Sequence, residues 1–556
     1  MEQNKRMPVG VDDFKALREQ YYFVDKTKFI QELIDGHSPV TLITRPRRFG
    51  KTLTMSMLYY FFTNENAEEN KKLFDGCAIA AAGEKYMAEQ GTRPVVFFSL
   101  KDIKMDTWEA CLKKLGLKLA SLYDRFGVLG ESGKLSNYQR RMFAEVLERR
   151  SEPEVLEGAL QHLSECLTTH YERKPILLID EYDAPIQSAW EHGYYDKAIG
   201  FFRNFLSAAL KTNPALDFAL LTGVLRISKE SIFSALNNLK VSSVIQGPYA
   251  DVMGFEKHEV EKMAADLGCL GKTAEIKEWY DGYNFSGREM YNPWSVISYF
   301  DEGCKPGAYW ANTSGNSILK SMLRRVDEER QGDLAGLMQG RPILSMLDEG
   351  LIYDDIYENK DALYTLLLTT GYLKCVGQQT AHGREWNELS IPNKEIRALF
   401  EKEILRNLSG YTEESTVFRM MDAMLDGNQE RFANLLQKIL RENVSAHDAA
   451  YPETFYHGMM LGFSLLLNDR YDIESNRESG YGRFDLAFIP KDKEKAGVIM
   501  EFKKAKNEAA LDTKAEEALR QIEGKEYMTA LSKRGISTAW KYGIAFCGKK
   551  LALVRG

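Results

Sequence analysis

The sequence has no apolar run of the roughly 18 or more residues that a membrane-spanning helix requires. Its longest apolar stretches, Val95–Leu100 and Gly458–Leu467, have the length of a core strand and a core helix. The N-terminal residues Met1–Phe14 are polar and lack the apolar segment of a secretory signal. We therefore expect a cytoplasmic protein without a membrane partner.

Paired cysteines are also missing. The seven cysteines are an odd number, they are scattered along the chain, and no Cys-x-x-Cys pair occurs. This pattern argues against a disulfide framework and against a zinc ribbon, and it is typical of reduced thiols in a cytosolic protein. Internal repeats and low-complexity linkers are absent as well, which argues against a solenoid.

The composition is that of a folded protein, with 44% hydrophobic and 28% charged residues among 556. This length suffices for about two to four domains. The net charge of −7 is uneven, because residues 451–556 hold 18 basic and 15 acidic residues, a net of +3, and the preceding residues carry −10. A basic C-terminal part on an acidic body fits a polyanion partner at that end.

The first half of the chain alternates short apolar runs with helical patterns. Four of these runs have the length of buried parallel strands: Val40–Thr44, Pro94–Leu100, Pro175–Asp180 and Asp217–Thr222. Buried strands separated by helices predict an α/β fold with a parallel sheet.

The middle of the chain has a mainly helical pattern, for example at Lys257–Leu267 and Ser317–Asp327. A helix at Asp361–Thr370, a Gly turn, a pair of short strands around Tyr372–Val376 and Leu389–Ile391, and a further helix from residue 393 follow. This order fits a winged-helix unit and equally fits a helical lid with a hairpin. The sequence does not decide between the two.

The pattern changes again near residue 451. A helix precedes three strands, a long helix and two more strands. The two helices are expected at Thr454–Leu467 and Leu511–Leu531, and the strands at Tyr471–Asn476, Arg483–Pro490, Gly497–Lys503, Lys541–Cys547 and Lys550–Val554.

A phosphate-binding loop is predicted directly after the first strand. The loop reads Arg45-Pro46-Arg47-Arg48-Phe49-Gly50-Lys51-Thr52, and a helical pattern follows it. The backbone N–H groups of such a loop and the N-terminus of the helix cradle a β-phosphate. Lys51 would reach the β- and γ-phosphates of ATP, and the Thr52 hydroxyl would bind Mg²⁺. Arg45 stands where the usual pattern has its first glycine, so the chain must enter this loop differently.

Two carboxylates end another of the apolar strands. Asp180 would hold Mg²⁺ through water, and Glu181 would polarise the water that attacks ATP. Asp180 follows Lys51 by about 130 residues, in the expected order. The loop and the acidic strand together are a far stronger signal than either alone.

Three polar residues of the C-terminal strands predict a second metal site. Residues two apart in a strand share a face, so Glu501 and Lys503 point together, away from their apolar neighbours. An acidic and a basic side chain on one face of a buried strand are costly unless they are paired or bound to a metal. Asp485, separated from Glu501 by 15 residues, would complete a carboxylate pair for Mg²⁺, and Lys503 would orient or activate the attacking water.

Four segments together resemble the bacterial AAA-ATPase-like family. These are Tyr22-Phe23-Val24-Asp25-Lys26-Thr27, the loop from Arg45 to Thr52, Asp180-Glu181-Tyr182-Asp183, and Leu221-Thr222-Gly223-Val224. Arginine in place of the first glycine is usual in that family. AAA-type ATPases sense the γ-phosphate with a polar residue at the end of this strand, and the resemblance implies that Thr222 has this role here. For Arg226 three roles are open: contact with phosphate, contact with a neighbouring subunit, or an ordinary ion pair. The segments Trp279–Tyr283 and Asn292–Trp294 also resemble the family, and we expect them to form the core of a lid.

Members of this family typically carry a C-terminal PD-(D/E)XK nuclease-superfamily domain. The residues Asp485, Glu501 and Lys503 match the motif of that superfamily, which often positions its site with a helix glutamine, here Gln521. Tyr527 lies on another face of the expected helix and receives no role. Glu478 is either a further metal ligand or a loop carboxylate, and His457 is expected to be a core histidine.

These observations predict an AAA-like P-loop ATPase domain in residues 1–250, a helical lid in 251–350, a winged-helix unit or helical connector in 351–450, and a restriction-endonuclease-like α/β domain in 451–556. ATP and Mg²⁺ would control a Mg²⁺-dependent nuclease that acts on nucleic acid, with DNA favoured by the resemblance, in defence or mobile-element biology. One alternative is an ATP-switched module that binds nucleic acid or protein without cutting. Another is a signalling ATPase with a structural tail. Whether the active form is a homo-oligomer is left open.

Overall fold

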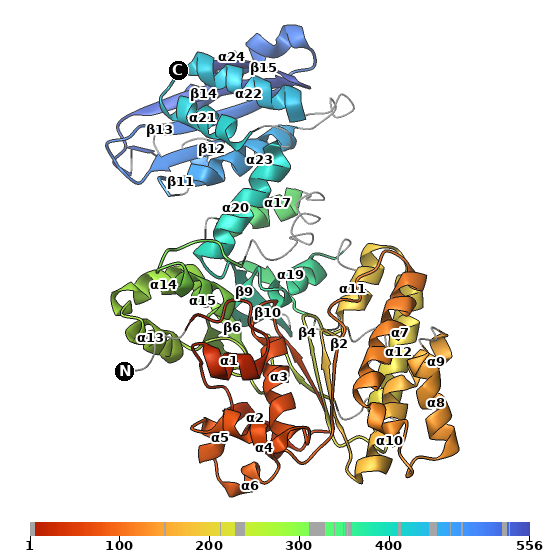
Figure 1. The fold of residues 1–556 in the computed structure, drawn as a ribbon. Helices are drawn as coiled ribbons and strands as arrows, with labels where there is room; N and C mark the ends of the chain where they lie inside the picture. The colour runs from red at the N-terminus through yellow and green to blue at the C-terminus, as the bar shows by residue number, and fades with distance from the viewer. Residues whose placement is uncertain are drawn as a thin grey trace. The chain divides into compact units, whose positions relative to one another are not determined.

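The chain folds into two compact units in the computed structural model (Figure 1). The N-terminal unit comprises Met1–Ser314 and Leu344–Glu395, and the C-terminal unit comprises Gly315–Ile343 and Ile396–Gly556. The structure describes residues 6–148, 152–211, 213–227, 239–310, 328–338, 340–348, 350, 353, 359–381, 383–409, 413–443, 453–467, 469–479, 482–524, 531–532 and 534–556.

A five-stranded parallel sheet forms the centre of the N-terminal unit. Its strands are β1 (Val40–Thr44), β2 (Val95–Ser99), β3 (Ile176–Asp180), β4 (Ala219–Gly223) and β5 (Leu239–Ser242), in the order β2-β3-β4-β1-β5. All neighbouring strands run parallel. Strands β1, β3 and β4 are buried along their whole length, as near-continuous apolar runs predict. The α/β class and the four predicted strands are confirmed, whereas β5, a short and mostly half-buried strand at the sheet edge, has no counterpart among the predictions.

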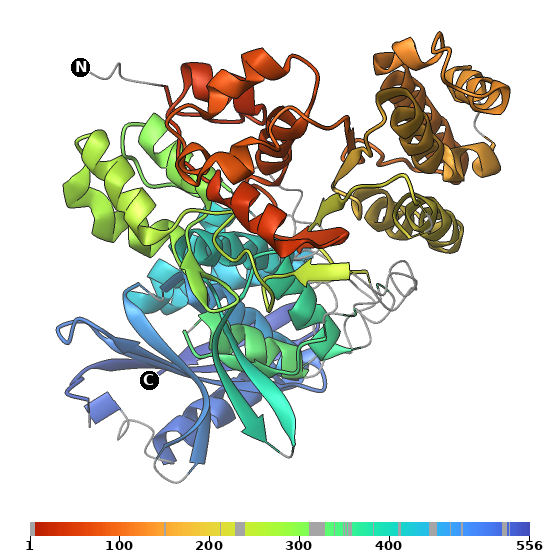
Figure 2. The ribbon, with the colours of Figure 1, turned by 90° about the horizontal axis from the view of Figure 1, so that it is seen from below.

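Two groups of helices flank this sheet on opposite sides (Figures 1 and 2). On one side lie α7 (Trp108–Arg125), α8 (Asn137–Leu147), α9 (Pro153–Glu157), α10 (Ala159–Tyr171), α11 (Ala184–Glu191) and α12 (Tyr195–Leu210). On the other side lie α13 (Lys257–Asp266), α14 (Thr273–Tyr280) and α15 (Pro293–Asp301). The helix α3 (Lys51–Phe62), which follows β1, packs against β2 and β3.

Local sequence signals explain where several of these helices begin. The side chain of Thr107 accepts a hydrogen bond from the backbone at the start of α7, and Ser136 forms a capping box with Gln139 at the start of α8. Asn292 caps α15, and Pro293 occupies its first position, where the missing N–H costs nothing.

The middle of the chain contains two small antiparallel elements. One is the hairpin of β6 (Tyr283–Phe285) and β7 (Arg288–Met290). The other is a three-stranded sheet in the order β8-β10-β9, formed by β8 (Ile343–Ser345), β9 (Lys374–Ala381) and β10 (Arg384–Ser390). The predicted sequence of helix, hairpin and helix is present as α19 (Lys360–Thr369), β9, β10 and α20 (Lys394–Ser409). The predicted helix at Ser317–Asp327 lies outside the described residues.

A five-stranded mixed sheet forms the centre of the C-terminal unit, in the order β11-β12-β13-β14-β15. Its strands are β11 (Tyr471–Ser479), β12 (Gly482–Pro490), β13 (Gly497–Lys504), β14 (Ala539–Cys547) and β15 (Lys550–Arg555). Strands β13 and β14 run parallel, and the other neighbouring pairs run antiparallel. The C-terminal α/β domain predicted from the sequence is therefore confirmed.

Helices cover both faces of this mixed sheet. The helix α24 (Leu511–Gly524) packs against β13, β14 and β15. A core cluster on the other face joins the sheet to α21 (Glu414–Leu425), α22 (Gln429–Asn443) and α23 (Glu453–Ser464). The side chains of Val498, Met500 and Phe502 enter that cluster, whereas Ile499 faces the α24 side. The strand β13 therefore alternates as predicted, and Glu501 lies on the α24 face.

Within the described ranges, no helix combines the length and the apolar character needed to cross a membrane. The seven cysteines, all of which are described, carry free thiols. Their reduced state agrees with the pattern expected from the sequence.

Candidate nucleotide and metal sites

The segment after β1 forms a tight loop that ends at α3. Arg48 and Gly50 have left-handed backbone conformations, with φ of 69° and 86°, and these turn the chain sharply before the helix. Lys51 is the first residue of α3, and its ammonium donates hydrogen bonds to the carbonyl oxygens of Arg45 (3.0 Å) and Pro46 (2.9 Å). The loop therefore places the Lys51 ammonium beside the N-terminus of α3. A positive charge and a helix N-terminus both favour a bound phosphate.

Lys51 is almost entirely buried. Burial lowers the pKa of its ammonium, and the negative charges of Glu181, Asp183 and Asp180 oppose that shift. The nearby carboxylates favour the charged form of the buried Lys51. An anionic ligand would stabilise this cation further, because it would replace the solvation that burial removes.

Three hydroxyl groups converge on Asp180, which is fully buried at the end of β3. Thr222 donates a 2.6 Å hydrogen bond to one carboxylate oxygen, and Thr52 donates a 2.9 Å bond to the other. Ser99, at the end of β2, donates a longer 3.3 Å bond to the second oxygen. The structure thus brings together Thr52, Asp180 and Thr222, three of the residues selected from the sequence.

Glu181 follows Asp180 in a left-handed conformation, with φ of 50°. This turn places Glu181 at a cavity of about 480 Å³ that Lys51, Thr52, Arg47 and Arg48 also line. The rest of the lining comes from residues 8–26, from α3, from residues 101–104 with the side chains of Lys101 and Lys104, and from the segments around α13 and α15. A cavity of this size, lined by basic side chains of the phosphate loop and by apolar side chains, can hold a nucleotide.

Arg45 has a role that differs from the rest of the loop. Its side chain is fully buried, and its guanidinium donates to the carbonyl oxygens of Thr44, Ser242 and Tyr249. Burial lowers its pKa to about 9, and Phe285 packs against it with 4.9 Å between the guanidinium carbon and the ring centre. The backbone N–H of Arg45 donates a 3.1 Å hydrogen bond to the carbonyl of Gly223, so both the side chain and the N–H of Arg45 hold the loop in place.

Three functional neighbours were not selected from the sequence. Besides Ser99, these are Tyr182 and Asp183, which hold the segment after β4. Asp183 accepts hydrogen bonds from the backbone N–H groups of residues 224 (2.8 Å) and 225 (2.9 Å), and the Tyr182 hydroxyl donates to the carbonyl of residue 225. Burial raises the pKa of Asp183. Arg226, which is half-buried, belongs to this clamped segment. The adjacency of Tyr182 and Asp183 to the acidic strand end was the signal that could have identified them.

The motif Trp279–Tyr283 packs against the phosphate loop. Tyr283 is buried and packs edge-on against Phe49 of the loop at 4.9 Å. Gly282 has φ of 94°, and a Cβ atom at this position would lie 2.2 Å from the carbonyl oxygen of Pro392, so no other residue fits without a backbone shift. The motif therefore belongs to a packed core, which agrees with the expectation for these residues.

A second group of polar side chains gathers on the α24 face of the mixed sheet. Glu501 is buried with 3% exposure. The Lys503 ammonium lies 3.4 Å from its carboxylate, and the Gln521 side chain of α24 donates a hydrogen bond to the same oxygen. The sequence selected these residues from two separate elements, and the fold brings them into contact.

Asp485 lies on the neighbouring strand β12 and adjoins this group. One of its carboxylate oxygens accepts a 2.7 Å hydrogen bond from the backbone N–H of Phe502. The ring of the half-buried His457 contacts the Asp485 carbonyl at 3.0 Å. Glu478 lies in β11 opposite Arg483, but its side chain falls outside the described part of the structure, as does the whole of Tyr527.

Both groups suit Mg²⁺, a hard cation that prefers oxygen ligands. In the first group the Thr52 hydroxyl and the Asp180 carboxylate already lie within 2.9 Å of each other. In the second group Glu501 presents a carboxylate that is buried almost completely beside Asp485, an arrangement whose cost a bound cation would offset. The donor sets therefore fit the metal that the sequence predicts at each place.

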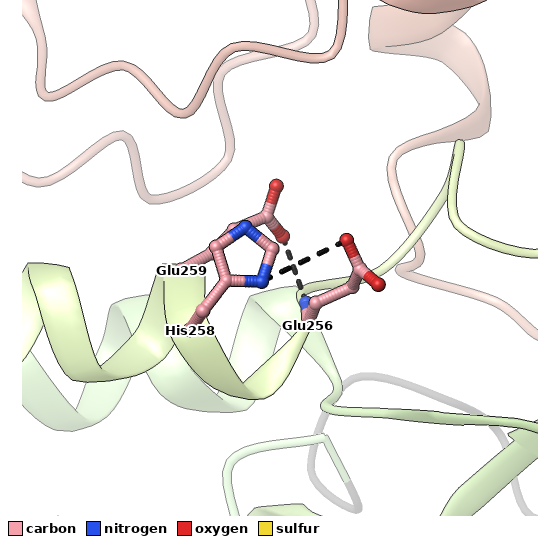
Figure 3. A group of neighbouring side chains, drawn as sticks. All are labelled: Glu256, His258 and Glu259. Carbon is pink, nitrogen blue, oxygen red and sulfur yellow. Dashed lines mark hydrogen bonds and ion pairs between the residues drawn. The ribbon is translucent and has the colours of Figure 1, made fainter.

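A third cluster of potential metal ligands has a different explanation. Glu256, His258 and Glu259 bring their ligand atoms within 4.8 Å of one another at the start of α13 (Figure 3). Glu256 and Glu259 form a capping box, and Glu259 also accepts a 2.7 Å hydrogen bond from Lys26. Glu256 is ion-paired with Arg288 at 3.3 Å. Helix capping and ion pairing account for these carboxylates, so the cluster does not indicate a metal site.

A phosphate loop and an acidic strand end on a parallel sheet, joined to a buried carboxylate–lysine pair on a mixed sheet, define a class: a P-loop ATPase-type domain linked to a nuclease-type domain. Comparison with known families agrees, since residues 8–233 match the AAA-ATPase-like family, described as a predicted AAA-ATPase, and residues 451–555 match the PD-(D/E)XK nuclease superfamily. The chain therefore carries an AAA-ATPase-like domain and a C-terminal domain of the PD-(D/E)XK nuclease superfamily, which is restriction-endonuclease-like in fold.

One curated relative spans nearly the whole chain. It is the "Uncharacterized protein in vnfD 5'region" of Azotobacter chroococcum mcd 1, which is 26% identical over 557 residues, covering 96% of this chain and 94% of that protein. The similarity therefore extends over both of the matched domains of this chain.

Proposed function

We propose that this protein is a Mg²⁺-dependent nuclease whose activity is controlled by ATP at the phosphate loop. The observation that carries the proposal is the group around Glu501, where a buried carboxylate is contacted by both Lys503 and Gln521. A purely structural tail would have little reason to keep such a costly arrangement on one face of a buried strand.

At the phosphate loop, different residues would bind the phosphates, hold the metal and orient the attacking water. Lys51 would bind the β- and γ-phosphate oxygens, and Thr52 and Asp180 would hold Mg²⁺, which neutralises the charge that develops on the phosphates. Glu181, at the cavity wall, would orient the attacking water and receive its proton. Thr222 would keep the Asp180 carboxylate in place through its 2.6 Å hydrogen bond.

At the mixed sheet, the proposed reaction is hydrolysis of a phosphodiester. Water attacks phosphorus, one P–O bond forms as the water loses a proton, the bond to the leaving sugar oxygen breaks, and that oxygen gains a proton. Asp485 and Glu501 would hold Mg²⁺, which supplies a Lewis acid for the phosphate. Lys503 would orient the water and stabilise the negative charge on phosphorus, and Gln521 would fix the Glu501 carboxylate.

We propose DNA as the substrate, on the basis of the resemblance to the AAA-ATPase-like family, with a role in defence or mobile-element biology. The slight basic excess of residues 451–556 supports a polyanionic partner at this end of the chain.

The test is cleavage by the full-length protein. Plasmid, single-stranded DNA and single-stranded RNA are incubated with Mg²⁺ or Mn²⁺, with and without ATP, using the wild type, Lys503→Ala and Lys504→Ala. Lys504 is the matched control, because it is the next residue of β13 and points to the opposite face. Cleavage that needs the metal and Lys503, and that responds to ATP, supports the proposal. ATP turnover without cleavage in any nucleotide state would refute the nuclease and favour an ATP-switched binding module.

A further inference from the structure

Two consecutive arginines of the phosphate loop are each held by a tryptophan of the same unit. The guanidinium carbon of Arg48 lies 4.2 Å from the centre of the Trp294 ring. The backbone carbonyl of Arg47 accepts a 3.0 Å hydrogen bond from the indole N–H of Trp310. Trp310 is buried with 1% exposure, so this bond to the loop is protected from competition by water.

The two tryptophan segments meet at one side chain, Glu395. The backbone N–H of Trp310 donates to Oε1 of Glu395 over 2.6 Å. The hydroxyl of Ser295, the residue after Trp294, donates to Oε2 over 2.7 Å. Glu395 is fully buried, and hydrogen bonds of this kind offset the cost of placing a carboxyl group there. A single side chain therefore ties together the two segments that grip the loop.

Glu395 also has a distinctive position along the chain. It is the second residue of α20, a helix whose residues from Ile396 onwards belong to the C-terminal unit. A carboxyl group in the first turn of a helix is favoured by the helix dipole. Glu395 thus contacts both tryptophan segments from the first turn of α20. The later residues of the same helix belong to the C-terminal unit, which also holds Glu501.

We propose that Trp310 and Glu395 are positioning residues that couple nucleotide binding at the phosphate loop to helix α20. This inference rests on the proposed function and adds the route by which ATP acts on the C-terminal unit.

The physical basis is a competition at the loop. Arg48 and Trp294 both line the cavity. A phosphate in the cavity competes for the Arg48 guanidinium, because a charge-assisted hydrogen bond to phosphate is stronger than a cation–π contact. When Arg48 leaves Trp294, the loop rearranges, and the Arg47 carbonyl shifts with it. Trp310 transmits that shift to Glu395, and hence to the first turn of α20.

Hydrogen exchange of the α20 amides tests this coupling in the full-length protein. Wild type, Trp310→Phe and Glu395→Gln are measured with Mg²⁺ alone and with Mg²⁺ plus a saturating non-hydrolysable ATP analogue, and calorimetry measures analogue binding in parallel. Trp310→Phe keeps an aromatic ring but removes the indole N–H. Glu395→Gln keeps the side-chain size but turns one acceptor into an NH₂ group that faces a donor.

The matched control is Glu278→Gln. Glu278 is exposed and forms a 3.2 Å ion pair with Lys394, the first residue of α20. This variant removes a carboxylate of α14 that is paired with the start of α20, without changing either tryptophan segment. Thermal unfolding shows whether each variant is folded. If Glu395→Gln does not fold, Trp310→Phe alone tests the coupling.

We expect the analogue to change exchange in the first turn of α20 by about threefold or more in the wild type and in Glu278→Gln. The change should disappear in Trp310→Phe and Glu395→Gln, although both still bind the analogue. An unaltered response in these variants overturns the coupling, and so does a wild type that binds the analogue without any response in α20. A wild type that binds no analogue overturns the proposed ATP function as well, and calorimetry distinguishes that outcome.

Discussion

Thr222, at the end of β4, donates a 2.6 Å hydrogen bond to Asp180, at the end of β3. The bond joins two neighbouring strands at the edge of the sheet where the phosphate loop lies. It also leaves Thr52 to donate to the other oxygen of the same carboxylate. The orientation of Asp180 therefore depends on hydroxyl groups from both sides.

Thr222→Val is expected to lower the rate of ATP hydrolysis by about tenfold with little change in ATP affinity. The variant is isosteric, but it removes a hydrogen bond to a charged group, which contributes on the order of 1.5–3 kcal/mol. Steady-state hydrolysis and calorimetry with ATP measure the two quantities, and Thr222→Ser should restore the rate. Thr41→Val is the matched control, because Thr41 is a buried strand residue whose hydroxyl has no hydrogen-bond partner among the described residues. Equal losses in both Val variants would contradict the assigned role.

Arg45→Gly recreates the usual glycine pattern of the phosphate loop, and we nevertheless expect it to damage the protein. The substitution removes a buried guanidinium that donates to three backbone carbonyl oxygens, and it leaves both a cavity and unsatisfied acceptors. The expected loss is about 3 kcal/mol or more of unfolding free energy, together with weaker ATP binding. Thermal unfolding measures this loss against Arg173→Gly, an exposed control. A stable Arg45→Gly protein with normal ATP affinity would show that the side chain is dispensable.

The elements that the sequence predicts well are those with a strong periodic or apolar signal. The strands β1 and β3 are fully buried and mostly apolar, and the residues selected for the nucleotide site lie at or directly after their ends. The alternation in β13 likewise indicates which face carries Glu501 and Lys503. The short strand β5 was missed because it has only four residues, of which three are half-buried.

Contacts between distant segments could not be predicted in the same way. Ser99 reaches Asp180 only because β2 lies beside β3, and sheet order is not visible in the spacing of residues. The hydrogen bond from Trp310 to the Arg47 carbonyl joins residues 263 positions apart. The buried side chain of Arg45 was also beyond prediction, since the loop pattern alone suggests a residue that faces phosphate. Local patterns therefore selected side chains that the fold brings together, whereas the residues that hold those side chains depend on the tertiary fold.

Gln521→Leu is expected to reduce metal-dependent cleavage by about tenfold and to raise the Mg²⁺ concentration needed for half-maximal rate. The leucine keeps the helix and its approximate volume but removes the donor that holds Glu501. Cleavage rates over a Mg²⁺ titration measure both effects, and DNA binding without metal should be unchanged. Glu516→Leu, on the exposed side of α24, is the control. Wild-type cleavage by Gln521→Leu would leave Gln521 as an ordinary helix residue.

Asp281 predicts a pH dependence of stability. Burial raises the pKa of this carboxyl group to about 6 from an ordinary value of 3.8, and the negative charge of Glu289 adds to the rise. Between these two values the folded state binds more protons than the unfolded state, so stability falls as the pH rises through the window. Above about pH 6 the ionised group costs the folded protein up to about 3 kcal/mol, and Asp281→Asn removes that cost. Thermal unfolding at pH 5.0 and 7.5 should therefore show a gain for Asp281→Asn relative to the wild type that is larger at pH 7.5. The control is Asp301→Asn at an exposed position, which should have the stability of the wild type at both pH values. If the gain in stability for Asp281→Asn does not grow with pH, Asp281 does not cause the predicted pH dependence.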